Sequence, residues 1–268
     1  MNVLDSFKLD GKVAVVSGGA GLYGFQIVTA LAEAGATVYV ASRNRENNEK
    51  KMSSLLERGY RISVLEFDLE DEKSILDLCE AVYEKEGRVD ILVNNAVLRC
   101  MKGYTDTAEN FTRSMIANAT GLFVISRAFG DRMAKAGGGS IINIGSYMGI
   151  LGPDYNLYKD TGMNVNGASS DYFFHKGGIT NYTRFLATHY GEYQVRANCV
   201  ELGGLYNEAS ESSVKGYDIF VKRYNEKTPL GRMANETDLK GLIVYLASDA
   251  SLYMTGAVIP LDGGYSVK

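Results

Sequence analysis

Two tyrosine–lysine pairs stand in the segment 153–178, which reads PDYNLYKDTGMNVNGASSDYFFHKGG. Tyr155 precedes Lys159 by four residues, and Tyr172 precedes Lys176 by the same interval. On a helix this interval places a phenol and an ammonium on one face. A nearby ammonium can lower the pKa of a tyrosine from its usual value of about 10, which suits the phenol to proton transfer. Either pair could therefore serve as a general acid and base.

The sequence after the second pair predicts a helix that holds Tyr172 and Lys176 together. Ser170 or Asp171 can cap its N-terminus. Apolar residues at helical spacing predict its buried face, namely Ile179, Tyr182, Phe185, Leu186 and Tyr190. The first pair lies between a proline and a glycine without a sustained period, which is typical of a loop. We therefore predict that the second pair is the functional one.

Short β-branched runs alternate with amphipathic stretches along the whole chain. The runs that predict strands are 12–19, 37–43, 61–68, 90–96, 139–146, 195–200 and 256–261. The stretches that predict helices are 25–36, 72–87, 107–135, 172–190 and 237–247. This alternation indicates right-handed crossovers in a parallel sheet, and no linker divides the chain. We expect an α/β fold in one domain, 1–268, with a flexible flap at about 203–228, where apolar periodicity is weak.

Composition limits the classes of partner. The 268 residues carry a net charge of -4, which weighs against nucleic acid because phosphates require a basic surface. Three scattered cysteines and two histidines predict reduced thiols and no metal site. The N-terminus has no apolar signal region and no run reaches membrane-spanning length. We expect a soluble cytoplasmic protein with a small-molecule substrate and no membrane partner.

A glycine-rich turn, SGGAGLYGFQ, follows the first predicted strand. Gly18, Gly19, Gly21 and Gly24 provide both the G-x-G-x-x-G and the G-x-x-G-x-x-G spacing. Between a strand and a helix, such glycines allow a pyrophosphate to approach the backbone and the helix N-terminus. The alternative is a merely structural turn, which would not need four glycines.

The end of the second predicted strand bears on the choice of dinucleotide. NAD-binding sites usually have an acidic residue there, which binds the ribose 2′-hydroxyl. This chain has Ala41, Ser42 and Arg43 instead. Arg43 can pair with a 2′-phosphate and Ser42 can donate to it, so NADP(H) is favoured over NAD(H). The alternative is that Arg43 is a solvated surface charge.

Taken together, the motifs resemble the short-chain dehydrogenase/reductase family over nearly the whole chain. The matching pieces are the glycine turn, Asp68, NNA at 94–96, Asn118, Ser146, YFFHK at 172–176 and LDGGY at 261–265. The resemblance implies a single-domain Rossmann fold with a doubly wound, seven-stranded parallel sheet, usually assembled as a homotetramer or homodimer. It also implies a catalytic set of Asn118, Ser146, Tyr172 and Lys176.

The resemblance assigns a role to each of these residues. Tyr172 would exchange a proton with the substrate oxygen, Ser146 would bind that oxygen, and Lys176 would hold the nicotinamide ribose. Asn118 would position a water chain, although it could also be a buried asparagine that bonds the backbone. The residues implied to bind the cofactor are Gly18, Gly21, Leu22, Tyr23, Gly24, Ser42, Arg43, Asp68, Leu69, Asn95, Ala96, Tyr172 and Lys176. Asp68 would meet the adenine, or cap the following helix.

Four positions depart from the family pattern. Leu22 stands where glycine is common, Val97 ends the NNA motif, Leu202 replaces a proline, and Asn207 replaces a threonine that often holds the carboxamide. None removes a group that the reaction requires. They affect the expected geometry around the nicotinamide.

Ser146 and Tyr172 lie 26 residues apart, roughly twice the family's usual separation. We expect the extra residues to form an insertion loop at 151–170 beside the substrate pocket. The residues predicted to line that pocket are Asp154, Tyr155, Tyr158, Lys159 and Asn164. Their polarity suits a sugar or sugar-acid-like substrate. The alternative is a surface embellishment or a subunit contact.

The expected function is an NAD(P)-dependent oxidoreductase that interconverts a secondary alcohol and a ketone on a polar small molecule. One alternative is an epimerase or dehydratase that uses the cofactor transiently. Another is a non-catalytic dinucleotide-binding protein. We interpret His175 and His189 as structural residues, since a lone helical histidine is more often packed than catalytic.

Overall fold

The computed structural model describes residues 2–163 and 169–267, and these form one α/β domain. A seven-stranded sheet has the order β3-β2-β1-β4-β5-β6-β7, and every pair of neighbours is parallel. The strands are β1 Val13–Ser17, β2 Thr37–Ser42, β3 Ile62–Glu66, β4 Ile91–Asn94, β5 Gly139–Ile144, β6 Val195–Leu202 and β7 Val258–Leu261. Seven predicted strands are thus confirmed, and so is the doubly wound Rossmann topology.

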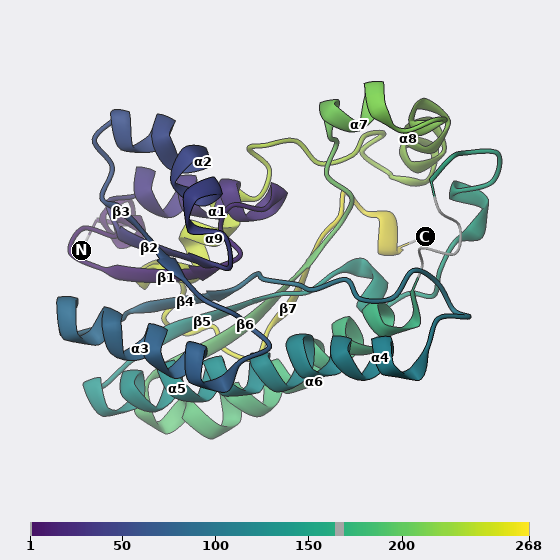
Figure 1. Cartoon of the computed structure of the whole chain (residues 1–268). Helices are drawn as coiled ribbons and strands as arrows, with labels where there is room; N and C mark the ends of the chain where they lie inside the picture. Colours follow the sequence, from purple (N-terminus) through teal and green to yellow (C-terminus); the bar gives the residue numbers. More distant parts are fainter. Residues whose placement is uncertain (1, 164–168, 268) are drawn as a thin grey trace.

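Helices cover both faces of this sheet (Figure 1). The helices are α1 Leu22–Glu33, α2 Arg45–Glu57, α3 Glu72–Glu86, α4 Ala108–Met115, α5 Leu122–Ala136, α6 Ser170–Tyr190, α7 Glu208–Ser213, α8 Tyr217–Lys227 and α9 Lys240–Ala247. Helices α1, α2 and α9 lie on one face, and α3, α5 and α6 on the other. The parallel strands are therefore shielded from solvent on both sides, as such strands require.

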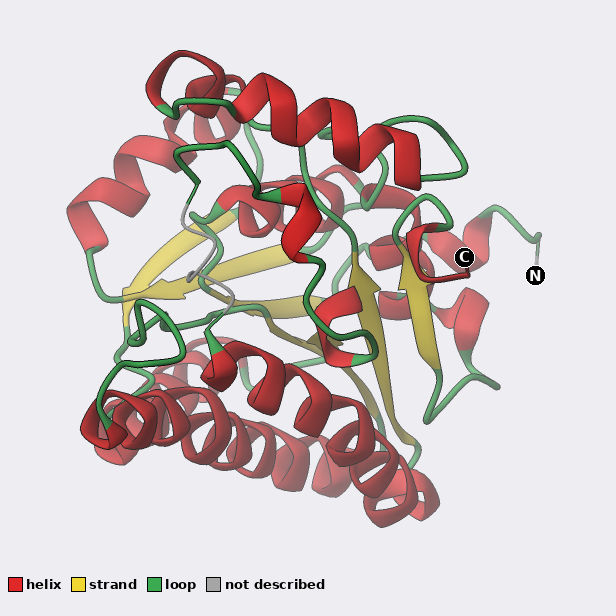
Figure 2. Cartoon of the chain, turned by 90° about the vertical axis from the view of Figure 1, so that its right-hand side faces the viewer, coloured by secondary structure: helices red, strands yellow, loops and turns green. Residues whose placement is uncertain are grey.

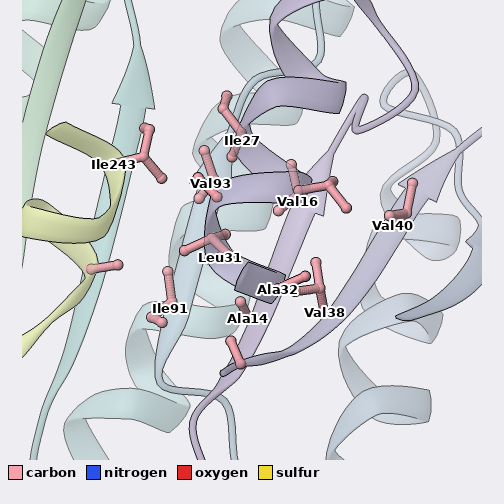
Figure 3. Packing of buried hydrophobic residues seen from close by; sticks show 14 of the residues in the cluster. Ala14, Val16, Ile27, Leu31, Ala32, Val38, Val40, Ile91, Val93 and Ile243 are labelled. Atoms are coloured by element: carbon pink, nitrogen blue, oxygen red, sulfur yellow. The ribbon is translucent and has the colours of Figure 1, made fainter. Parts of the chain in front are cut away.

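The two faces of β1 belong to two different cores. Ala14 and Val16 pack with Leu31 of α1 and Ile243 of α9 (Figure 3). Val13 and Val15 point the other way, into a cluster with residues of α3, α5 and α6. All five residues of the strand are buried. This is why residues 13–16 are apolar without alternation.

Two helical segments differ from the sequence expectation. Helix α2 was not predicted, because Asn48, Met52 and Leu55 are its only buried residues. The stretch 107–135 was expected to be one helix, but a π-helical segment, Ile116–Gly121, separates α4 from α5. Single π-turns inside helices are often found at functional sites. Here the π-turn contains Asn118.

A third core joins segments that lie far apart in the chain. It joins Tyr147, Leu157, Tyr217, Phe220, Tyr224, Met233 and Tyr265, and we call this set the tyrosine cluster. The segment expected to be a flexible flap holds α7 and α8, which lie together at one end of the sheet (Figure 1). This end faces the viewer in Figure 2. The periodicity of the segment was weak because α7 has no buried residue and α8 has three, Tyr217, Phe220 and Tyr224. Whether it is flexible stays a prediction.

No helix in the described part of the chain combines the length and the apolar character needed to cross a membrane.

Candidate active site

A cavity of about 680 Å³ opens where the parallel strands end. Its walls come from the loops after β1, β2, β3, β4, β5 and β6 and from the start of α6. The strand order reverses between β1 and β4, and ligands of open α/β sheets bind at such a switch point. Every residue predicted to bind the cofactor lines this cavity, and so does Ser146.

The glycine turn fits a bound pyrophosphate. Gly18 has φ +65°, and a Cβ there would lie 2.8 Å from the Cα of Ala96. A Cβ on Gly24 would collide with the carbonyl oxygen of Gly18. The side-chain amide of Asn95 donates to the carbonyl oxygens of Ser17 and Gly18, at 3.1 and 2.9 Å. Because these positions are glycines, the backbone can turn closely in front of the N-terminus of α1 and leave space there for a pyrophosphate. We call this turn, Gly18 to Gly24, the glycine cradle.

The opposite end of the cavity, after β2 and β3, is rich in cations. Arg43 is 55% exposed and lies 3.8 Å from the carboxylate of Glu70. Arg113 also binds Glu70 through two hydrogen bonds of 2.7 and 2.9 Å, and it holds the pKa of that carboxyl below its usual range. Lys51 of α2, which was not predicted, reaches the carbonyl oxygen of Ala20 at 3.0 Å and lines the same cavity. The anionic charge of Glu70 is thus already balanced.

Two predicted residues at this end make local bonds. Ser42 accepts a hydrogen bond from the side-chain amide of Asn48. Asp68 accepts from the backbone nitrogen of Glu70 at 2.9 Å and lines the cavity. Asp71, rather than Asp68, caps helix α3. Of the two roles considered for Asp68, helix capping is therefore wrong.

Tyr172 and Lys176 come together on the first turns of α6. The ammonium of Lys176 lies 5.7 Å from the centroid of the Tyr172 ring. It donates to the carbonyl oxygen of Ile144 at 2.5 Å and is nearly buried, with 4% of the residue exposed. The helix starts at Ser170 after the N-cap Ser169, so neither Ser170 nor Asp171 caps it as predicted. Helix α6 nevertheless presents the phenol and the ammonium to one cavity.

The first tyrosine–lysine pair does not form such an arrangement. Tyr155 starts a three-residue 3₁₀-helix and is 57% exposed, and Lys159 is exposed beyond its end. Asp154 pairs with Lys227 of α8. Of the insertion residues expected to line the pocket, Tyr158 does so, Asp154, Tyr155 and Lys159 do not, and Asn164 lies outside the described residues.

Ser146 is held at the end of β5 by a residue that the sequence analysis missed. Its backbone nitrogen donates to the carboxylate of Glu201 at 2.5 Å. Glu201 is 0% exposed and also accepts from the hydroxyl of Thr180 at 2.8 Å and from the thiol of Cys199 at 3.4 Å. Burial and Glu201 raise the pKa of the Cys199 thiol, and Lys176 opposes that rise. Glu201 gave no signal because it follows the predicted strand 195–200, and nothing in the sequence shows that this carboxylate is buried.

Asn118 faces a different space from the main cavity. Its side chain exchanges hydrogen bonds with the backbone of Leu98, at 2.8 and 2.7 Å, and donates to Ser114 at 3.0 Å. It also lines a small cavity of about 10 Å³ with Lys176 and His175. That volume is roughly the space that one water needs. Both roles considered for Asn118, backbone bonding and contact with a water, are therefore compatible with its position.

His175 is buried without hydrogen-bond partners in the described part of the chain, which the sequence did not indicate. It is 4% exposed, and neither ring nitrogen has a partner among the described residues. Burial and then Lys176 lower its pKa to about 3, so the ring is neutral near pH 7. His189, in contrast, is exposed and stacks on Phe185 at 5.5 Å. The sequence shows that His175 is next to Lys176, but the spacing of residues does not show that His175 is buried.

The structure shows where the four departures from the family pattern lie. Leu22, Val97 and Leu202 line the main cavity. Asn207 does not, because its side chain caps α7 by accepting from the backbone nitrogen of Ala209. Ser146, Tyr172 and Lys176 line the same cavity as these three departures.

Comparison with known proteins shows the family to which the chain belongs. The family model described as Enoyl-(Acyl carrier protein) reductase matches residues 21–266. An uncharacterized oxidoreductase of Thermotoga maritima is 32% identical over 97% of this chain and 98% of its own length. The chain belongs to the short-chain dehydrogenase/reductase family. It is an oxidoreductase of the kind that binds a nicotinamide dinucleotide, and the glycine cradle fits such a group.

Two further relatives of this short-chain dehydrogenase/reductase carry informative names. D-threitol dehydrogenase of Mycolicibacterium smegmatis is 30% identical over 98% of this chain and 95% of its own. The solved structure of a gluconate 5-dehydrogenase from Burkholderia cenocepacia, in complex with NADP and tartrate, superposes with a TM-score of 0.86. That protein is 26% identical, and the match covers 100% of both chains. Similar proteins thus include enzymes named for a neutral polyol and for a sugar acid.

Proposed function

We propose that this protein is an NADP(H)-dependent dehydrogenase that interconverts a secondary alcohol and a ketone on a small polyhydroxylated substrate. The observation that carries the proposal is the convergence of Ser146, Tyr172 and Lys176 on the cavity that also holds the glycine cradle. The named relatives act on threitol and gluconate, which are polyhydroxylated. The bound nicotinamide would supply or accept the hydride.

The side chains would handle the proton and the charge on the substrate oxygen. Tyr172 would donate its phenolic proton to the oxygen as negative charge develops there, and take it back in the reverse direction. The hydroxyl of Ser146 would donate a hydrogen bond to the same oxygen. Lys176, 5.7 Å from the Tyr172 ring, would favour the phenolate and bind the nicotinamide ribose. Asn118 would place a water next to Lys176, through which the proton leaves.

The preference for NADP(H) rests on charge. Arg43 and Lys51 line the end of the cavity after β2, and Arg113 already pairs with Glu70 there. A 2′-phosphate would therefore meet two cations, and the nearby carboxylate of Glu70 is already paired with Arg113. The ribose of NAD, in contrast, would find no acidic residue at the end of β2. This favours the phosphorylated dinucleotide.

Titration of the purified protein with NADPH and NADH, followed by nicotinamide fluorescence, tests the cofactor choice. We expect tighter binding of NADPH, and a loss of that preference in Arg43→Gln. Lys176→Ala should weaken binding, whereas Lys159→Ala should leave it as in the wild type. Equal affinity for both dinucleotides would contradict the charge argument.

Turnover tests the reaction itself. The protein with NADP⁺ would be offered D-threitol, glucitol and D-gluconate, and NADPH formation would be followed by absorbance. Net reduction of the cofactor supports the dehydrogenase. A tightly retained cofactor and an isomerised substrate, without net reduction, would instead support the epimerase alternative. Binding of cofactor with no turnover of any polyol would favour the non-catalytic alternative.

We also propose that the protein is a homodimer or homotetramer and works in the cytoplasm. Four apolar side chains of the π-turn, α5 and α6 are exposed: Ile116 by 44%, Phe123 by 44%, Phe174 by 67% and Phe185 by 57%. Phe185 was predicted to be buried within the chain. Exposed apolar side chains, when they gather on one surface, are typical of an association site. The three free cysteines are compatible with a reducing compartment.

A further inference from the structure

Arg99 lies against the ring of the proposed catalytic tyrosine. It follows β4, and its guanidinium carbon is 4.4 Å from the centroid of Tyr172. The side chain is exposed to the same cavity as Ser146 and Lys176. Arg99 forms no ion pair and no hydrogen bond with any residue that the structure describes. The guanidinium is thus placed by stacking alone, and its donors are available.

The charges around this end of the cavity do not balance Arg99. The acidic residues in the described lining are Asp68 and Glu70, which belong to the end after β3, where Arg43 and Arg113 neutralise Glu70. Glu201 is fully buried behind Ser146 and does not line the cavity. Tyr158 does line it, and burial raises the pKa of that phenol although Arg99 acts against the rise. An unpaired positive charge therefore faces neutral hydroxyl groups where the substrate would lie.

The geometry favours a planar anion. The guanidinium carbon lies over the face of the Tyr172 ring, and Arg99 is among the residues that line the cavity. An arginine in this position keeps a planar fork of N–H donors for a ligand. Two parallel N–H groups match the two oxygens of a carboxylate, which accepts both hydrogen bonds at once. Because the guanidinium lies over the Tyr172 ring, it is close to the residue that would exchange the proton. A carboxylate held there would be bonded to a carbon close to the reacting one.

We propose that Arg99 binds the carboxylate of the substrate, so that the enzyme selects polyhydroxy acids and their keto acids over neutral polyols. This rests on the proposed function, of which it names the substrate class. Arg99 is a specificity-determining residue in this scheme, and the proton and hydride transfers are the same for acids and polyols. The remaining hydroxyl groups of the substrate meet the cavity-lining phenols of Tyr158, Tyr147 and Tyr224.

The test uses D-gluconate and glucitol, two six-carbon polyols that differ in one terminal group, a carboxylate in one and a hydroxymethyl in the other. The wild-type enzyme with NADP⁺ should have the higher kcat/KM for D-gluconate. In Arg99→Gln the ratio of the two kcat/KM values should fall by about tenfold or more, mainly through the KM for D-gluconate, because a charged bidentate pair is lost. Arg99→Lys keeps the charge without the fork and should fall between the two.

Arg43→Gln is the matched control, since Arg43 is an exposed arginine at the other end of the same cavity. It should change the KM for NADP⁺ and leave the ratio for the two polyols within about twofold. An unchanged ratio in Arg99→Gln, or an equal fall of the ratio in Arg43→Gln, would overturn the assignment. A preference for glucitol 6-phosphate over D-gluconate would also overturn it, since it would indicate a phosphate in place of the carboxylate.

A binding measurement separates this inference from the proposed function. Calorimetric titration of the protein with bound NADPH uses D-gluconate, tartrate and glucitol and needs no turnover. Tighter binding of the two acids than of glucitol, lost in Arg99→Gln, would support the carboxylate site even if no polyol were oxidised. If the wild-type complex bound neither acid more tightly than glucitol, the inference would be wrong, although the enzyme could still oxidise neutral polyols.

Discussion

The carboxylate of Glu201 accepts a hydrogen bond from the backbone nitrogen of Ser146 at 2.5 Å, and Glu201 has no exposed surface. The ammonium of Lys176 binds the carbonyl oxygen of Ile144, two residues earlier in the chain, also at 2.5 Å. Two buried side chains of opposite charge thus hold the same turn of backbone. Between them is Gly145, where a Cβ would collide with the Glu201 carboxylate. The position of Ser146 therefore depends on Glu201 as well as on β5.

Replacing Glu201 should show this dependence. Glu201→Ala leaves the Ser146 N–H and the Thr180 hydroxyl without an acceptor, at a cost of about 1–3 kcal/mol for each unpaired group. We expect a lower free energy of unfolding in urea and a lower kcat. Glu201→Gln keeps an acceptor oxygen and should recover part of both. Glu84→Ala, at an exposed position of α3, is the control, and a Glu201→Ala protein as stable as this control would contradict the interpretation.

The two tyrosines of the opening motif provide a direct comparison. Tyr172→Phe removes the proposed proton donor and should lower kcat by about 100-fold or more. Tyr155→Phe removes an exposed phenol and should leave kcat close to that of the wild type. Steady-state rates with a polyol substrate measure both. Comparable activity in the two variants would place the chemistry elsewhere.

His175 should make the folded protein sensitive to acid. Its pKa is about 3 in the folded protein, below the ordinary value of 6.5, because burial and then Lys176 disfavour the charged ring. Asp171 acts in the opposite direction with a smaller effect, and Arg99 lowers the pKa slightly further. The unfolded chain binds the proton first, so stability falls as the pH drops below about 6.5, by up to about 1.4 kcal/mol per pH unit. Urea unfolding at pH 7.5 and pH 5.5 should show a smaller loss for His175→Gln than for the wild type. His189→Gln, at an exposed site, should behave like the wild type.

Two glycines should respond in opposite ways to alanine. Gly24→Ala drives a Cβ into the carbonyl oxygen of Gly18 and should abolish the binding of NADPH. Gly178 lies in α6, and a Cβ there would meet nothing within 4 Å. Gly178→Ala should therefore stabilise the protein by about 0.5–1 kcal/mol and keep cofactor affinity. Thermal unfolding and fluorescence titration distinguish the two, and destabilisation by Gly178→Ala would show that its small size is needed.

The exposed aromatic residues of α5 and α6 should mediate assembly. Phe185→Glu places a charge in the proposed interface and should shift the protein toward the monomer in sedimentation velocity. Leu56→Glu introduces the same charge at a comparably exposed apolar site on α2, with 42% exposure, and should leave the assembly intact. A wild-type protein that is monomeric at all concentrations would refute the proposed oligomer.

The sheet, the glycine turn and the helix after Tyr172 could be predicted because each has a strong local signal in the sequence. Val13 to Val16 and the strands beside them are buried on both faces, so they are apolar without interruption. The glycine turn is demanded by contacts such as that of Gly18 with Ala96, and its spacing is visible in the chain. The choice between the two tyrosine–lysine pairs followed from the helical period after Tyr172.

The residues that were missed depend on contacts between distant segments. Glu201 acts on Ser146, 55 residues earlier. Arg99 lies over the ring of Tyr172, which stands on a different element. Helix α8 buries Tyr217, Phe220 and Tyr224, whose partners lie in the insertion and near the C-terminus. Periodicity along one segment reports whether it has a buried face, but it does not report what that face meets.

The tyrosine cluster has a consequence for how such enzymes diverge. Its residues pack with one another, whereas the sheet has separate cores on its two faces. Mutations in the insertion and in α8 can therefore accumulate without disturbing the glycine cradle that receives the dinucleotide. Substrate preference and coenzyme binding would then be inherited as separable traits. A lineage could acquire a new carbohydrate substrate by changing this one cluster while it kept its redox partner.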